Sequence, residues 1–127
     1  MARRQIFWAC VAVAAWPGLA LAQSAAAGKA LFDQDCAICH LASGQGGVRF
    51  GDAVSANLTA PGLEALYHHQ DALIARAILQ AKDQDGAPLD MPMPAWQGRL
   101  TKAEVMEIID FIRADAARPL CLPHADD

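Results

Sequence analysis

The segment C-A-I-C-H, residues 36–40, constrains this chain more than any other part of its sequence. It places two thiols and an imidazole within about one turn of helix. Three chemistries use thiols at such a spacing: a redox-active disulfide, half of a tetrahedral metal site, and covalent attachment of a haem. The rest of the sequence indicates which of these three chemistries applies.

The first 22 residues are typical of a secretory signal peptide. Arg3 and Arg4 form a basic start, residues 6–15 an apolar run, and residues 20–22 (A-L-A) a small-x-small cleavage site before Gln23. The apolar run is shorter than the roughly 20 residues needed to span a bilayer. We therefore expect export to the periplasm and removal of residues 1–22. Cys10 lies inside this segment and away from the cleavage point, which argues against a lipid-modified cysteine.

The expected mature chain, residues 23–127, is acidic. It holds all 14 acidic residues but only 8 of the 10 basic ones, so its formal net charge is −6. Such a chain lacks the basic face that nucleic-acid binding needs, and we expect it to meet a membrane only through partners. It makes one domain with a modest core, ending in a mobile tail at residues 118–127. A covalently held cofactor would help to fill that core.

Export also affects which chemistry the cysteines are expected to have. Outside the cytosol thiols tend to form disulfides, but Cys36, Cys39 and Cys121 are an odd number. A zinc site needs about four ligands, and the motif supplies three, with His40 directly beside Cys39. A thioredoxin-like C-x-x-C should lie beside a βαβ pattern, and the mature chain has no strand-forming run. These interpretations fail.

The spacing C-x-x-C-H is typical of c-type haem attachment. Two thiols on one helical turn can each add to a vinyl group on the same edge of a porphyrin. The residue after the second thiol then offers an imidazole nitrogen to the iron. We predict one haem c bound covalently through Cys36 and Cys39, with His40 as an axial ligand.

A second axial ligand is offered by D-M-P-M-P-A-W-Q-G-R-L-T, residues 90–101. Its alternating prolines fix φ and favour extended geometry in the preceding residues, which predicts a stiff, non-helical loop. Haem iron in c-type proteins is commonly held by His and Met. Met91 and Met93 both qualify by chemistry, whereas Met106 lies in the following predicted helix and suits packing.

At this point the chain resembles the class I monohaem cytochromes c over nearly its whole mature length. The matching segments are G-K-A-L-F-D-Q-D-C-A-I-C-H (28–40), S-A-N-L-T (55–59), D-G-A-P-L-D-M-P-M-P-A-W (85–96) and L-T-K-A-E-V-M-E-I-I-D-F-I-R (100–113). The resemblance implies an all-α fold, a small cytochrome c fold with about four helices wrapped around one covalently attached haem. The family's Met-Pro-small-aromatic pattern aligns on Met93, which favours Met93 over Met91. The chain departs from the family by having no proline soon after His40, and the carbonyl that orients this imidazole is not evident.

The resemblance also implies electron transfer and no catalysis. The chain is similar to bacterial cytochromes that serve periplasmic dehydrogenases, so its expected partners are a dehydrogenase donor and an oxidase or another cytochrome as acceptor. With His40 and Met93 both bound, the iron has no open position for a substrate. The alternatives are a permanent haem subunit of a dehydrogenase complex and, less favoured, a peroxide- or gas-binding haem protein.

Apolar spacing independently predicts helices. The residues at helical intervals are Gly28, Phe32, Cys36 and Cys39; Leu63, Leu66 and Tyr67; Ile74, Ala77, Ile78 and Ala81; and Val105, Ile108, Ile109 and Ile112. Thr101 and Glu104 fit a capping box at the start of the last helix. The family resemblance implies that this helix crosses the first one at Gly28, with Phe32 and Phe111 beside the contact. The glycine-rich residues 41–60 are expected to form a loop with little regular structure.

Four further side chains have candidate roles. His68 and His69 rival Met93 as ligands, but their polar surroundings favour a solvated surface pair, and His124 lies near the end of the expected tail. Cys121 is either a free thiol or a bridge to another chain. Trp96 is expected to pack in the core or the haem pocket, where its indole could donate to a haem propionate.

Overall fold

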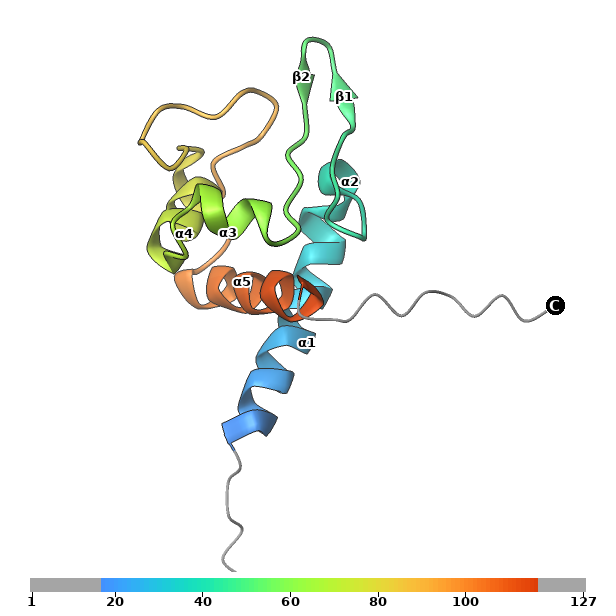
Figure 1. The fold of residues 1–127 in the computed structure, drawn as a ribbon, viewed down its shortest axis with the longest axis vertical. Helices are drawn as coiled ribbons and strands as arrows, with labels where there is room; N and C mark the ends of the chain where they lie inside the picture. Colours follow the sequence, from blue (N-terminus) through green and yellow to red (C-terminus); the bar gives the residue numbers. More distant parts are fainter. Residues whose placement is uncertain (1–16, 117–127) are drawn as a thin grey trace, which may run out of the picture.

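The computed structural model describes residues 17–116 and is mainly helical (Figure 1). Its helices are α1 (Pro17–Asp35), α2 (Ala37–His40), α3 (Gly62–Leu66), α4 (Asp71–Gln80) and α5 (Lys102–Ala116). Two short strands, β1 (Arg49–Phe50) and β2 (Ala53–Val54), pair in antiparallel fashion. Within residues 17–116, no helix combines the length and apolar character needed to cross a membrane. The predicted all-α fold is confirmed. Cys10, Cys121, His124, the expected tail and most of the expected signal peptide lie outside the described residues.

Helices α1 and α5 cross at closest approach over Gly28, as predicted (Figure 1). A Cβ atom at this position would lie 1.8 Å from the backbone carbonyl oxygen of Glu107, so a side chain cannot fit without separating the helices. Beside the crossing, the rings of Phe32 and Phe111 pack with their centroids 5.2 Å apart, tilted by 55°. That distance falls in the favourable range for aromatic pairs. The crossing therefore fixes the helix that leads into the C-x-x-C-H motif.

Most of the core comes from apolar residues that the spacing predicted, although Leu66 is 51% exposed. Val105, Ile108 and Ile109 of α5 are almost fully buried, together with Phe32 of α1. Helix α5 begins with the expected capping box: the Thr101 amide donates to the Glu104 carboxylate (2.7 Å), and the Glu104 amide donates to the Thr101 hydroxyl (3.2 Å). These two bonds satisfy amides that a helix start otherwise leaves unpaired.

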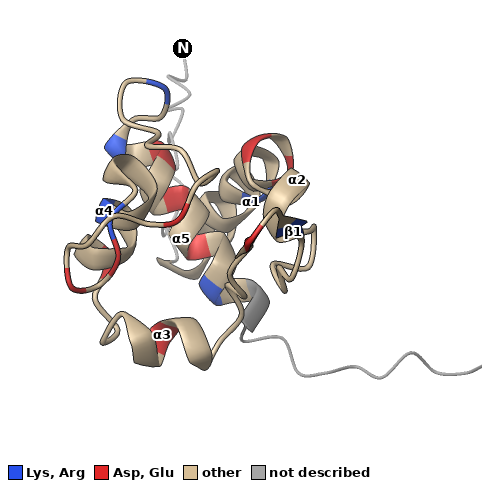
Figure 2. Ribbon diagram, turned by 90° about the horizontal axis from the view of Figure 1, so that it is seen from above, with Lys and Arg blue, Asp and Glu red and all other residues tan. Residues whose placement is uncertain are grey.

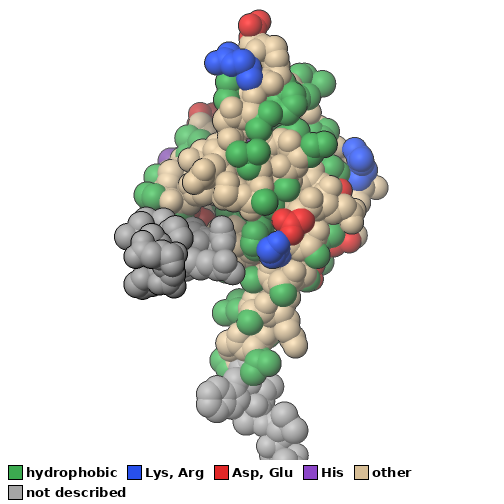
Figure 3. All heavy atoms as spheres, turned by 90° about the vertical axis from the view of Figure 1, so that its right-hand side faces the viewer, with side chains coloured by type: hydrophobic (Ala, Val, Ile, Leu, Met, Phe, Trp, Pro, Cys, Tyr) green, Lys and Arg blue, Asp and Glu red, His purple; other side chains and the backbone are tan. Residues whose placement is uncertain are grey.

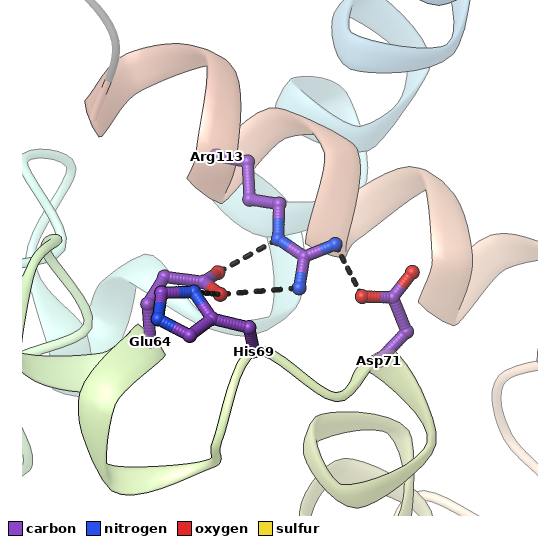
Figure 4. A network of polar contacts seen from close by, with 4 residues as sticks. All are labelled: Glu64, His69, Asp71 and Arg113. Carbon is purple, nitrogen blue, oxygen red and sulfur yellow. Dashed lines mark hydrogen bonds and ion pairs between the residues drawn. The ribbon is translucent and has the colours of Figure 1, made fainter.

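Helices α3 and α4 are joined to the end of α5 by one arginine (Figure 4). Arg113 Nε donates to Glu64 Oε1 at 2.7 Å and Nη2 donates to Glu64 Oε2 at 3.3 Å, while Nη1 pairs with Asp71. The Glu64 carboxylate also lies 3.2 Å from Nδ1 of His69. The hydrogen bond from Arg113 is the main cause that holds the pKa of Glu64 below its usual 4.5.

Residues 41–60, expected to form a loop with little regular structure, contain one short hairpin. Residues 49–54 form the β1–β2 hairpin, which projects from the body of the molecule near α2 (Figure 1). No strand pattern is visible in the sequence, because each strand has two residues and is too short for an alternation of apolar and polar side chains. The hairpin is closed by a turn at Gly51, whose φ of +63° suits glycine.

Candidate haem site

The predicted attachment motif lies where α1 ends. Helix α1 stops at Asp35 and α2 continues through His40, so the two thiols lie on consecutive helical segments. Cys36 and Cys39 are free and half-buried, whereas Ile38 between them is 81% exposed. Burial is the largest cause that raises the pKa of the Cys36 thiol to about 11, with Asp35 and Cys39 adding to it. The unattached thiol is therefore neutral at physiological pH, as suits a group that packs against the core.

The His40 imidazole is buried, with a relative exposure of 9%, and has a defined hydrogen bond. Its Nδ1 lies 2.9 Å from the backbone carbonyl oxygen of Ala56. A carbonyl oxygen can only accept, so Nδ1 carries the proton and donates. This is the orienting carbonyl that the sequence left unidentified. It takes the part that the family resemblance assigns to the carbonyl of a proline soon after the histidine.

The residues present fit a covalently bound haem. The hydrogen bond at Nδ1 fixes the tautomer and leaves the lone pair of Nε2 free to bind iron, which is the usual arrangement of a metal-ligating histidine. The two thiols adjoin this imidazole in the chain and are not engaged in a disulfide. Among the described residues, no three His, Cys, Asp or Glu side chains gather as ligands for a simple metal ion.

The loop that carries Met91 and Met93, residues 89–96, is called the methionine loop and is attached to the end of α4 at both of its ends. The Leu89 amide donates to the Ala81 carbonyl at 2.8 Å, and the Trp96 amide donates to the Ile78 carbonyl at 3.0 Å. Between these anchors the described structure has one backbone hydrogen bond, from the Met93 amide to Asp90 (3.2 Å). The loop is non-helical, as its prolines predicted.

The two methionines differ in exposure. Met91 is 77% exposed, whereas Met93 is half-buried. A ligand to a haem within a protein has to face inward, so the burial agrees with the choice of Met93. Both histidines proposed as rivals, His68 and His69, are exposed, and His69 contacts Glu64.

The structure adds to the candidate site one residue that was not expected from the sequence, Arg76 of α4. Its Nη2 donates to the carbonyl oxygens of Asp83 (2.8 Å) and Gln84 (3.0 Å), which holds the turn that precedes the methionine loop. Its buried Nε has no partner among the described residues. A buried charged donor needs an acceptor, and an anionic group such as a haem carboxylate has the right chemistry. The sequence signal was an arginine on the otherwise apolar stretch of α4 between Ile74 and Ile78.

Trp96 packs at the edge of the core, as expected. Its side chain is half-buried against the core, and the guanidinium of Arg99 lies 4.6 Å from the ring centroid. No hydrogen bond of the indole N–H is present among the described contacts. Its predicted bond to a haem propionate stays a prediction.

Comparison with known proteins agrees with this geometry. The model of the family named Cytochrome c matches residues 25–114. Cytochrome c6 of Euglena viridis is 25% identical to this chain over 96 residues, which are 72% of this chain and 93% of that protein. A 24-residue segment is 75% identical to part of the acyl-carrier-protein–UDP-N-acetylglucosamine O-acyltransferase of Caulobacter vibrioides. It covers 19% of this chain and 9% of that enzyme, too little to carry an argument about function.

No solved structure has a significant match to the chain. The family match, however, covers well over half of the sequence and contains the thiols, the buried imidazole and the methionine loop. It confirms the resemblance and the predicted cofactor. The chain belongs to the cytochrome c family, as a class I monohaem c-type cytochrome with covalently attached haem c.

Proposed function

We propose that this electron-carrying haem protein works in the periplasm, with its haem attached through Cys36 and Cys39 and its iron held by His40 and Met93. The bound haem supplies one-electron chemistry, because its iron can move between the ferrous and ferric states. The observation that carries the proposal is the hydrogen bond from His40 Nδ1 to Ala56, at 2.9 Å, which presents Nε2 for iron beside two free thiols.

The chain's own residues perform three tasks in this proposal. Ala56 orients the His40 ring and raises the basicity of its free nitrogen. The anchors at Leu89 and Trp96 hold the methionine loop against α4, so that the Met93 thioether would be available to bind the iron. With His40 and Met93 both bound to the iron, no position would remain for a substrate, and the protein would carry an electron without catalysing a reaction. A thioether ligand also raises the reduction potential.

Export is supported by the packing of α1. Within its first part, residues 17–22 are all exposed, including Leu19 and Leu21, which are 63% and 64% exposed. Two contacts of α1 with α5 lie after the proposed cleavage point: the Ser24 hydroxyl donates to Asp110 (2.6 Å), and the backbone of Gly28 lies against that of Glu107. Among the described residues, removal of 17–22 would therefore take away no buried side chain and would remove two exposed leucines.

The proposed partners are periplasmic redox proteins, a dehydrogenase as donor and an oxidase or another cytochrome as acceptor. Apolar side chains are exposed near the attachment motif and on the hairpin, namely Ile38, Leu41, Phe50 and Val54. Figure 3 shows hydrophobic side chains on the hairpin end of the molecule. Acidic groups are spread over α3, α5 and the loop beside α4 (Figure 2). We therefore expect a small, transient contact with a partner that presents basic residues, so that association slows as salt increases.

The test is to isolate the exported protein and to measure its mass and its redox behaviour. We expect the mass of the chain from Gln23 plus one haem, haem that resists acid–acetone extraction, and a reversible one-electron couple. A ferric absorption band near the red end of the spectrum should report the Met–Fe bond. Extractable haem, or a protein without a reversible couple, would reject the proposal.

A further inference from the structure

The acceptor of the His40 hydrogen bond is held by a short ladder, which we call the histidine clip (residues 44–47 and 55–58). At one end the Leu58 amide donates to the Gly44 carbonyl at 2.7 Å. At the other end the Gly47 amide donates to the Ser55 carbonyl at 2.9 Å. Ala56 lies between these bonds, so the position of its carbonyl depends on how closely the two sides of the clip approach.

The closest approach within the clip is at Gly46. A Cβ atom on this residue would lie 2.2 Å from the carbonyl oxygen of Ala56 and 2.6 Å from its carbonyl carbon. These are backbone atoms, which cannot turn aside as the end of a flexible side chain can. The Gly46 amide also donates to the carbonyl of His40 at 2.9 Å, so the same residue contacts the ligand and its acceptor.

We propose that Gly46 is a positioning residue, which lets the Ala56 carbonyl rest on His40 Nδ1 and thereby sets the reduction potential of the haem. The inference rests on the proposed function, in which His40 binds the iron. A carbonyl that accepts from Nδ1–H makes the imidazole more basic. A more basic ligand favours the ferric state, so this hydrogen bond lowers the potential.

The direct test is the Gly46→Ala variant of the holoprotein. The added methyl group displaces the Ala56 carbonyl and weakens its bond to His40. We expect the midpoint potential to rise and the His40 Nδ1 proton, followed by NMR, to exchange with solvent roughly tenfold faster, the factor expected for loss of one ordinary hydrogen bond. The Met–Fe band should remain, because the methionine loop is untouched.

The matched control is Gly51→Ala. Gly51 has φ of +63° and Gly46 has φ of +62°, so both substitutions impose the same left-handed strain on alanine. A Cβ atom on Gly51 meets no atom within 4 Å. This variant should therefore keep the wild-type potential and the wild-type exchange rate at His40.

Ser55→Ala provides a milder second variant, which decides the matter if Gly46→Ala yields no holoprotein. Ser55 Oγ accepts from the Val48 amide at 2.9 Å, so its removal loosens the clip without adding bulk. We expect a smaller rise in potential and a smaller gain in exchange rate. Potentials equal to the Gly51→Ala control in every variant that binds haem would overturn the inference. A wild-type protein without a reversible couple would instead reject the proposed function.

Discussion

The two segments that carry the proposed iron ligands are held in different ways. The His40 side, residues 41–60, is bonded along its length, by the histidine clip and by the hairpin within it. The Met93 side is bonded mainly at its ends, through Leu89 and Trp96, and Met91 on it is 77% exposed. His40 is thus followed by a segment with backbone hydrogen bonds along its length, whereas Met93 lies on a loop that is bonded to α4 mainly at its two ends.

This difference indicates which part of the molecule opens more easily. Local opening costs little free energy where few backbone bonds and few buried contacts have to be broken. The span between Leu89 and Trp96 meets that description, whereas the histidine clip does not. We therefore expect the Met93 side to open more readily than the His40 side, with the helix crossing at Gly28 intact in both states.

The largest expected effect comes from Met93→Ala, which removes the proposed iron ligand on the methionine loop. The Met–Fe band should disappear and the potential should fall, because the thioether that favours the ferrous state is gone. Met91→Ala is the control, and it should leave both properties nearly unchanged, since this side chain faces solvent. Loss of the band in Met91→Ala with retention in Met93→Ala would show that the register of the loop is wrong.

The second expected effect comes from a substitution that weakens the support of the methionine loop and leaves both proposed iron ligands in place. Arg76→Ala removes two charge-assisted bonds to the carbonyls of Asp83 and Gln84, worth about 2 kcal/mol. The Met–Fe band should then be lost at a lower temperature, while the His40 Nδ1 proton stays protected.

Arg99→Ala is the matched control for this experiment, because it removes the same charge from a residue shortly after the methionine loop and leaves the bonds to Asp83 and Gln84 in place. Arg99 is exposed and stacks on Trp96, a contact worth about 0.5–1 kcal/mol at such a site. It should change the melting of the band less than Arg76→Ala does. Equal effects of the two variants would mean that net charge and not the Asp83–Gln84 turn controls the loop.

The smallest expected effect is on stability, through the ion pair between Glu64 of α3 and Arg113 of α5. Helix α3 follows the His40 side in the chain. The pKa of Glu64 is lowered in the folded protein, so its stabilisation is present above about pH 4.5 and is lost as pH falls through the folded pKa. Glu64→Gln should lower the free energy of unfolding near neutral pH by at most about 1 kcal/mol, since Arg113 is partly exposed to solvent.

Denaturant unfolding of the holoprotein between pH 7 and pH 3 measures this effect. The difference between Glu64→Gln and wild type should shrink as the pH falls. Asp52→Asn, at the exposed tip of the hairpin, controls for the loss of one carboxylate. A difference that stays constant with pH would mean that Glu64 acts through packing and not through its charge.

Side-chain patterns predicted much of the fold. The capping box of Thr101 and Glu104, and the apolar stripe through Val105, Ile108 and Ile109, follow from spacing within one helix. The crossing at Gly28 with its Phe32–Phe111 pair was implied by the family resemblance. These features depend on side chains whose type is visible in the sequence.

The histidine clip could not be predicted in the same way. The acceptor for His40 is a backbone carbonyl, which every residue possesses, so nothing in the identity of Ala56 marks it. Gly46 was visible as one of several glycines, but its contact joins residues ten positions apart across a hairpin that had no strand signal. The bonds of Arg76 were likewise hidden, because they also end on backbone carbonyls.

Native-state hydrogen exchange of the oxidised holoprotein tests most directly whether the two ligands are held differently. Two amides report on the His40 side, those of Ser55 and Leu58, and two on the methionine loop, those of Leu89 and Met93. We predict that the amides of Ser55 and Leu58 exchange through openings whose free energy is close to that of global unfolding. The amides of Leu89 and Met93 should exchange through a local opening of lower free energy. Equal protection of both pairs, or stronger protection of the methionine loop, would contradict this account.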